Sequence, residues 1–371
     1  FISKNYSRDQ LQQKSIQIEN QYYRLKFDNR GRISSIYDKN LERELVESEK
    51  KANQLQFFVD KPPRYDAWEI EADFAENEIK KELKLEKFTV AEDDLEKRAI
   101  LNWSFRDSTI KQEIILLNDK KRIDFKSELD WQEREILVKT AFPVDVLSEE
   151  ASYEIAFGQI KRPTNSNTDY EKAQFEVPAH RWADLSESGF GISLLNDSKY
   201  GYDIKDNLMR LTLLKSSNYP DPTADAGRHS FTYSLCSHSG SLRNSQTLNE
   251  AENINEKLSF KRIKTFKEDS LKKSAHNLFE PILEIKEGKS RLSALKKAEN
   301  DEAVILRFYE HYGGRDRVKK KLRDFFTIKA VEKVNLLENK MEEQIGFKLN
   351  NNYLSFELNR FEIRSFKLYL K

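Results

Sequence analysis

Cysteine is almost absent from this sequence, in which Cys236 is the only one. A lone cysteine cannot form an internal disulfide, so we expect a reducing compartment, the cytoplasm. Long apolar runs are also lacking, since none approaches the roughly 20 residues that a membrane-spanning helix needs. The chain begins at Phe1 without a signal-peptide pattern, and we therefore expect a piece of a longer polypeptide.

An excess of charge of either sign is missing as well. The 64 Lys and Arg residues nearly balance the 63 Asp and Glu residues, for a net charge of +1. No overall field therefore attracts nucleic acid or an anionic membrane, whereas a neutral sugar remains a suitable partner. The length of 371 residues allows two or three domains, and 38% hydrophobic residues can build their cores.

Histidine is scarce, and its positions offer no metal motif. No His-x-x-x-His or Cys-x-x-Cys pair occurs, so we expect no metal or other cofactor in this chain. Carboxylates are too many for their number to identify a catalytic pair. The five histidines are His180, His229, His238, His276 and His311.

Short alternating segments dominate what is present. In RIDFKSELDW, Ile123, Phe125, Leu129 and Trp131 alternate with charged or polar residues, which is typical of a strand with one buried face. The turn Asn29-Arg30-Gly31 separates two strand-like runs and predicts a hairpin. We predict further strands over 98–105, 110–117, 137–142, 153–157, 191–195, 208–214 and 231–235, and strands joined by long hairpins within the charged segment 71–97.

Such regular short strands, without βαβ alternation or a glycine-rich phosphate loop, predict a mainly β chain with an antiparallel sandwich. We interpret residues 1–14 as a linker remnant and residues 15–270 as one large β-sandwich. A polar stretch over 237–273 marks the boundary, and residues 271–371 form a smaller C-terminal β-sandwich domain. Within the latter, Lys319–Arg323 is interpreted as a solvated face.

Six blocks resemble, in order, the C-terminal β-rich region of α-mannosidases of glycoside hydrolase family 38, in particular the cytosolic and bacterial subgroup. They are ENQYYRLKFDNRGRISSIYDK, NQLQFFVDKPPRYDAWEIE, LDWQEREILVKTAFPVD, FGQIKRPTNSNT, the long block from Phe175, and LSALKKAENDEAVILRFYEH with FEIRSFKL. The resemblance implies a large sandwich of the galactose-mutarotase type followed by a smaller one.

The resemblance also implies a parent enzyme that removes terminal α-mannosides with retention, using two carboxyl groups and a zinc ion. In the family these lie on an N-terminal α/β domain that precedes the β region. The family's His-x-Asp zinc motif has no counterpart here, because no histidine is followed by Asp two residues later. We therefore expect this chain to be inactive alone, with its own N-terminal catalytic domain and a mannoside as partners.

In the family the large β domain forms one wall of the sugar pocket. By position, the resemblance makes Arg162, Tyr65, Asp66 and Trp68 the substrate-binding candidates. Arginine can donate a planar fork to sugar hydroxyls, and an aromatic ring packs against the apolar face of a pyranose. The alternative is that Trp68 belongs to the core and that Arg162 pairs with a local carboxylate.

Two further motifs favour structural roles. We expect Arg181 and Asp184 to form an ion pair that holds a loop, with Trp182 as packing. In the loop from Tyr219 to His229, fixed by its prolines and glycine, we expect an interdomain hydrogen-bond network of Asp221, Asp225, Arg228 and His229. Direct sugar contact by either motif, and a calcium site on Asp221 and Asp225, remain alternatives.

Three functions stay open at this point. The first is the C-terminal part of an α-mannosidase, serving as scaffold and pocket wall. The second is an independent carbohydrate-binding module, which would bind a mannoside unaided. The third is an enzyme of the aldose-epimerase kind, which needs a Glu base and His acids. Homo-oligomerisation also stays open.

Overall fold

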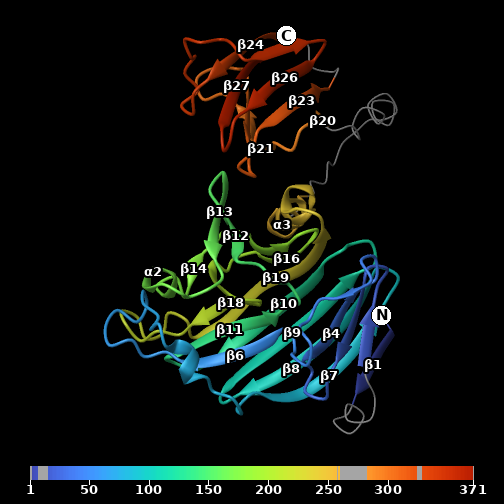
Figure 1. Cartoon of the computed structure of the whole chain (residues 1–371), viewed down its shortest axis with the longest axis vertical. Helices are drawn as coiled ribbons and strands as arrows, with labels where there is room; N and C mark the ends of the chain where they lie inside the picture. Colours follow the sequence, from blue (N-terminus) through green and yellow to red (C-terminus); the bar gives the residue numbers. More distant parts are fainter. Residues whose placement is uncertain (1, 7–15, 257, 260–281, 324–327, 371) are drawn as a thin grey trace, which may run out of the picture. The chain divides into compact units, whose positions relative to one another are not determined.

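The computed structural model describes residues 2–6, 16–256, 258–259, 282–323 and 328–370 (Figure 1). The chain divides into two compact units, of which the first comprises residues 1–154 with 160–257 and the second residues 155–159 with 258–371. Both are built mainly from antiparallel strands, so the predicted fold class is confirmed.

Ten strands form the largest sheet of the first unit. Apolar and polar residues alternate along them, as in β10, where Ile123, Phe125 and Leu129 are buried and Lys126 is exposed. This period of two turns one face of the sheet toward the core. The strands are, in spatial order, β1 (Ile2–Tyr6), β7 (Lys84–Glu92), β8 (Glu96–Phe105), β9 (Ser108–Leu117), β10 (Ile123–Trp131), β19 (Gly227–Ser239), β16 (Phe190–Asn196), β15 (Trp182–Glu187), β12 (Glu150–Ile155) and β13 (Gly158–Pro163).

Two smaller sheets share one hydrophobic core with the large sheet. One contains β14 (Val177–Pro178), β17 (Gly201–Lys205), β18 (Leu208–Lys215), β11 (Ile136–Pro143) and β6 (Gln54–Val59). The other contains β2 (Ile16–Glu19), β3 (Tyr23–Phe27), β4 (Ile33–Asp38) and β5 (Arg43–Glu44). Between the layers, Phe57 on β6 stacks on Phe105 on β8 at 4.1 Å between ring centroids. Burying one such ring stabilises the fold by about 1.5–3 kcal/mol.

The predicted hairpin at Asn29-Arg30-Gly31 joins β3 to β4. Asp28 N–H donates to the carbonyl of Arg32 at 2.9 Å, which closes the turn. Gly31 lies in the left-handed region at φ +76°, where a residue with a Cβ is strained. The turn also packs tightly on the large sheet, since a Cβ on Gly31 would lie 2.5 Å from Cδ2 of Leu101.

The second unit is a sandwich of two four-stranded sheets, with rings such as Phe356 and Phe366 (centroids 4.9 Å apart) between them. One sheet contains β20 (Leu283–Glu287), β23 (Asp316–Leu322), β26 (Tyr353–Leu358) and β25 (Phe347–Asn350). The other contains β21 (Arg291–Lys297), β22 (Val304–Tyr309), β27 (Ile363–Leu370) and β24 (Ile328–Val334). The solvated face predicted for Lys319–Arg323 is wrong at Lys320, which is buried, because alternate residues of β23 point into the sandwich.

The helices of the described residues are short. They are η1 (Phe74–Asn77), α2 (Asp169–Lys172), η2 (Leu242–Asn244) and α3 (Thr247–Asn255). Thr168 and Glu171 form a capping box that begins α2. In the described residues, no helix combines the length and apolar character needed to cross a membrane.

The N-terminal segment contains a strand of the large sheet. Of the segment interpreted as a linker remnant, Ile2–Tyr6 forms strand β1 and pairs with β7 of the large sheet. Residues 7–14, the predicted boundary between residues 270 and 271, and His276 lie outside the described residues.

Candidate functional site

Two exposed aromatic rings lie on the segment that follows β6. Tyr65 is 57% exposed and Trp68 is 68% exposed, so the alternative that Trp68 belongs to the core is wrong. Their ring centroids are 6.3 Å apart in an edge-to-face arrangement. The carbonyl of Tyr65 accepts the N–H of Trp68 at 2.8 Å and that of Glu69 at 3.1 Å. This tight turn holds both rings outside the sandwich.

Asp66, between the two rings, connects this turn to the loop after β18. Its carboxylate is nearly buried and accepts the backbone N–H of Asn218 at 2.5 Å and that of Tyr219 at 3.0 Å. Hydrogen bonds to an ionised group are about twice as strong as neutral ones. Tyr219 is itself 60% exposed, so Asp66 joins two loops that carry three exposed rings. In Figure 1 both loops lie at the same end of the first unit.

A buried charge cluster lies on the outer face of the five-stranded sheet. Lys139 on β11 is fully buried, and its Nζ donates to Glu176 and lies 4.6 Å from the ring centre of Phe74. The other carboxylate oxygen of Glu176 accepts the hydroxyl of Thr212 at 2.6 Å. Sequence reasoning missed this cluster, because ILVKTAFP has the pattern of an apolar strand with one lysine.

Two more ion pairs extend this cluster. Asp203 pairs with Arg210 at 2.7 Å, and Asp60 pairs with Lys215. Burial raises the pKa of both carboxyls, and the negative charge of Glu176 adds to the rise in each case. Each carboxylate of the cluster has a cation beside it. We therefore assign the cluster a structural role, which is to stabilise the five-stranded sheet.

Arg162, the fourth substrate-binding candidate, lies on β13. Its guanidinium is 4.7 Å from the ring centre of Tyr153, and burial lowers its pKa. Its Nη1 is buried without a hydrogen-bond partner, and no ion pair with a described residue engages it. The alternative of a local carboxylate partner is therefore wrong within the described residues. Among the described residues, no hydrogen bond or ring contact joins Arg162 to Tyr65, Asp66 or Trp68.

The expected ion pair between Arg181 and Asp184 is wrong. Arg181 instead binds Glu154, whose carboxylate accepts the Arg181 backbone N–H at 2.8 Å and its guanidinium at 2.5–3.1 Å. Residues three apart in an extended chain point to opposite faces, which separates Arg181 from Asp184. Asp184 is buried and binds Ser186, Ser193 and His238, with His238 Nε2 at 2.9 Å. Trp182 is fully buried, as its packing role requires.

The loop from Tyr219 to His229 forms mainly local contacts. Asp221 accepts the backbone N–H and the hydroxyl of Thr223, and these bonds lower the pKa of its carboxyl. His229 Nε2 lies 2.8 Å from the carbonyl of Asp225, and Arg228 is exposed. Over the described residues, no group of three or more His, Cys, Asp and Glu side chains could hold a metal ion.

Comparison with protein families gives two matches. The model described as "Glycosyl hydrolases family 38 C-terminal domain" matches residues 18–223. The model described as "Glycosyl hydrolases family 38 C-terminal beta sandwich domain" matches residues 290–366. Together they cover parts of both structural units.

Comparison with curated proteins and solved structures gives relatives along nearly the whole chain. Alpha-mannosidase G of Dictyostelium discoideum is 30% identical over 95% of this chain, and an alpha-mannosidase of Saccharomyces cerevisiae is 33% identical over 91%. The chain spans only 32% and 33% of their lengths. An alpha-mannosidase structure from Enterococcus faecalis V583 superposes with a TM-score of 0.74 at 15% identity, covering 95% of this chain and 42% of that one.

Proposed function

Because the chain belongs to glycoside hydrolase family 38, of which it carries the C-terminal β domains, we propose that it is the C-terminal part of a retaining, zinc-dependent exo-α-mannosidase. In that enzyme it braces an N-terminal catalytic domain and forms one wall of the sugar pocket. The observation that carries the proposal is the similarity to alpha-mannosidases over 95% of the chain.

The exposed aromatic turn is the part of this chain that contacts the sugar. Tyr65 and Trp68 present their faces to the apolar side of a pyranose, and Asp66 fixes the turn through its bonds to Asn218 and Tyr219. This arrangement costs little entropy on binding, because the backbone that carries the rings is already held.

In this proposal Arg162 makes the polar contact with the sugar. The residue is partly exposed and its Nη1 has no hydrogen-bond partner among the described residues, so the guanidinium donates to a sugar hydroxyl without breaking an existing bond. We assign Arg181, Trp182 and Asp184 to the support of the sandwich. Asp221, Asp225, Arg228 and His229 face the catalytic domain in this proposal.

The bond-breaking groups belong to the catalytic domain. Retaining hydrolysis needs two carboxyl groups about 5 Å apart, and the carboxylates described above are each engaged by a cation, by backbone N–H groups or, for Asp184, by two serine hydroxyls and His238. The described residues offer no group that fits zinc, so the proposal places the metal in the catalytic domain. It also places the protein in the cytoplasm, in agreement with the buried free thiol of Cys236.

The test compares this chain with the full product of its gene on 4-nitrophenyl α-mannoside. We expect hydrolysis with retention, abolished by a zinc chelator, from the full product and none from the 371-residue chain. Trp68→Ala in the full product should raise KM about tenfold, because the lost stacking contact contributes about 1.4 kcal/mol and this free energy corresponds to a tenfold change in binding. Leu95→Ala, which removes an apolar side chain that is 73% exposed in the turn between β7 and β8, is the control and should leave KM unchanged. Hydrolysis by the chain alone, or none by the full product, contradicts the proposal.

A second measurement separates the carbohydrate-binding module from the pocket wall. Methyl α-mannoside is titrated into the 371-residue chain while its tryptophan resonances are followed. A pocket wall should show no saturable shift, because half of the site is missing. Saturable binding that Trp68→Ala removes would instead establish an independent module.

A further inference from the structure

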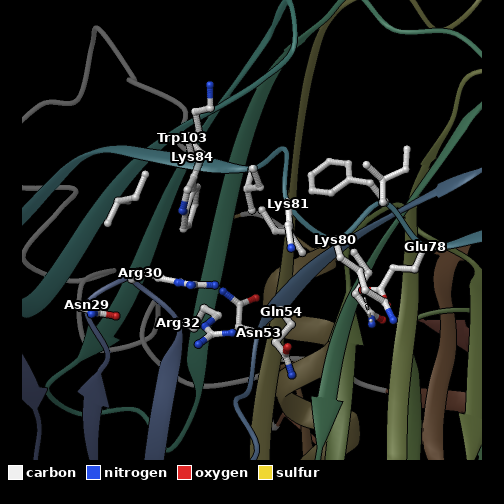
Figure 2. Close-up of a pocket in the computed structure, with 17 residues that line it drawn as sticks. Asn29, Arg30, Arg32, Asn53, Gln54, Glu78, Lys80, Lys81, Lys84 and Trp103 are labelled. Carbon is white, nitrogen blue, oxygen red and sulfur yellow. Dashed lines mark hydrogen bonds between the residues drawn. The ribbon is translucent and has the colours of Figure 1, made fainter.

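A large pocket lies in the first unit, away from the aromatic turn. It has a volume of about 890 Å³ and opens between the turn of the β3–β4 hairpin, strand β6 and the segment that precedes β7 (Figure 2). Trp103 on β8 is 6% exposed and forms part of its wall. Small-molecule sites typically measure about 300–1,000 Å³, so the pocket is large enough for a ligand of sugar size.

The pocket is strongly cationic although the chain is nearly neutral. Five basic residues line it against one acidic residue, Glu78. Arg32 is paired with Asp28 at 2.7 Å. The other four have no ion pair with a described residue; they are Arg30, Lys80, Lys81 and Lys84. Elsewhere in the unit lysines and arginines commonly have acidic partners, so this concentration of free positive charge favours an anionic ligand.

Arg30 and Lys81 reach the pocket from two different elements, the β3–β4 turn and the segment before β7, and Asn53 and Gln54 lie below both in the view of Figure 2. Arg30 lies beside Gly31, whose close packing on Leu101 fixes the turn. An arginine fork from one element and an ammonium group from the other can bind the oxygens of one phosphate group.

Amide groups supply the remaining polar atoms. Gln56 donates through Nε2 to Glu78 at 3.3 Å, whereas its Oε1 is buried and has no hydrogen-bond partner among the described residues. A buried acceptor without a partner costs about 1–3 kcal/mol, and a hydroxyl of a bound ligand would satisfy it. Asn29 and Gln54 offer further amides at the rim.

We infer that this pocket binds a phosphorylated carbohydrate, with the phosphate between Arg30 and Lys81 and the sugar ring against Trp103 and Gln56. The inference goes beyond the proposed mannosidase function, since binding here requires neither the aromatic turn nor hydrolysis. A nucleic acid is the weaker match, because it needs an extended basic track on the surface.

The experiment titrates the 371-residue chain with mannose 6-phosphate, glucose 6-phosphate, mannose and inorganic phosphate by calorimetry at low salt. The Trp103 indole N–H resonance, assigned from Trp103→Phe, reports on the pocket. We expect a hexose phosphate to bind at least tenfold more tightly than mannose or inorganic phosphate and to shift the Trp103 resonance. Raising the salt should weaken binding, because exposed charges are screened.

Variants locate the site. Arg30→Gln combined with Lys81→Gln should weaken hexose phosphate binding at least tenfold, and Lys126→Gln, at an exposed lysine on β10, is the matched control without effect. Circular dichroism checks that each variant is folded. Absence of hexose phosphate binding overturns the inference, as does binding that the double variant leaves unchanged. Equal binding of inorganic phosphate overturns the assignment to a carbohydrate, and competition only by an acidic peptide would identify a protein-docking site instead.

Discussion

Asp66 and Tyr219 are 153 residues apart in the chain, yet the carboxylate of Asp66 accepts the backbone N–H of Tyr219 at 3.0 Å. The same carboxylate accepts the N–H of Asn218. One side chain therefore holds two loops of the first unit together, and with them the exposed rings of Tyr65, Trp68 and Tyr219.

Removing this carboxylate should release the loop after β18. We expect Asp66→Ala to speed hydrogen exchange at the amides of Asn218 and Tyr219 by roughly 10- to 100-fold, because each loses a bond worth about 1.5–3 kcal/mol. Asp73→Ala is the control, since Asp73 makes no side-chain cap bond to η1. Equal exchange in both variants would show that the loop is held by other contacts.

Loss of the buried Arg181–Glu154 pair should destabilise the first unit. Glu154 is 2% exposed, so Arg181→Ala leaves an uncompensated buried carboxylate and should lower the free energy of unfolding by about 3 kcal/mol. Urea unfolding followed by tryptophan fluorescence measures this, because all four tryptophans lie in the first unit. Lys161→Ala removes the exposed pair with Glu150 and should cost less than about 1 kcal/mol. A loss in Arg181→Ala no greater than this would contradict the assignment.

Lys320 should make the second unit more stable as the pH rises. Burial lowers the pKa of Lys320 to about 8, whereas its ordinary value is 10.5. Between these values the unfolded chain binds one proton more than the folded chain, so the free energy of unfolding increases with pH. Below pH 8 Lys320 is protonated in both the folded and the unfolded state. Burying its charge then lowers the free energy of unfolding by the full amount.

The variant Lys320→Met removes this dependence. It should be more stable than the parent by about 2 kcal/mol at pH 7, and the difference should shrink toward pH 10. Urea unfolding by circular dichroism gives the value, with tryptophan fluorescence marking the separate transition of the first unit. Lys348→Met, at an exposed lysine on β25, should show no such trend. Parallel pH curves for the parent and Lys320→Met would refute the role of burial.

Gly288 should tolerate no side chain. Its φ is +92°, and a Cβ there would lie 2.8 Å from the backbone carbonyl oxygen of Arg317. Gly346 has a similar φ of +79° but meets only the Arg364 side chain at 3.4 Å. Gly346→Ala should therefore cost about 1 kcal/mol for backbone strain alone, and Gly288→Ala about 2–4 kcal/mol in total. The free energy of unfolding of each variant is measured by circular dichroism. Similar decreases in the two variants would show that the contact with the Arg317 carbonyl is relieved without a loss of stability.

Much of the strand assignment could be predicted from the sequence. The segments predicted over 98–105, 110–117, 137–142, 191–195, 208–214 and 231–235 all lie within strands. The segment predicted over 153–157 is a strand only to Ile155, where a turn to β13 begins. The short helices of the described part of the chain were not predicted, because each is held by local caps or by packing rather than by a long amphipathic pattern.

The candidate site was only partly predictable. Tyr65, Asp66 and Trp68 lie within four positions of the sequence, so their proximity in the structure could be predicted from the motif itself. Tyr219 was missed as a third ring, since its loop is linked to the turn of Tyr65 and Trp68 through the backbone N–H groups of Asn218 and Tyr219 that donate to Asp66. The partner of Arg181 was misassigned to Asp184, because nearness in the sequence says little about pairing across strands.

The sequence by itself determined the fold class and the family, since alternation along a strand and the order of the matching blocks are properties of the chain read locally. The tertiary structure alone decided which charges meet. Lys139 reaches Glu176 across 37 residues and Lys215 reaches Asp60 across 155. It also decided which cations around the pocket of Figure 2 have no ion pair within the described residues. The physical reason is that such contacts depend on the order and register of the strands in the sheets, and these are fixed only when distant segments share one core.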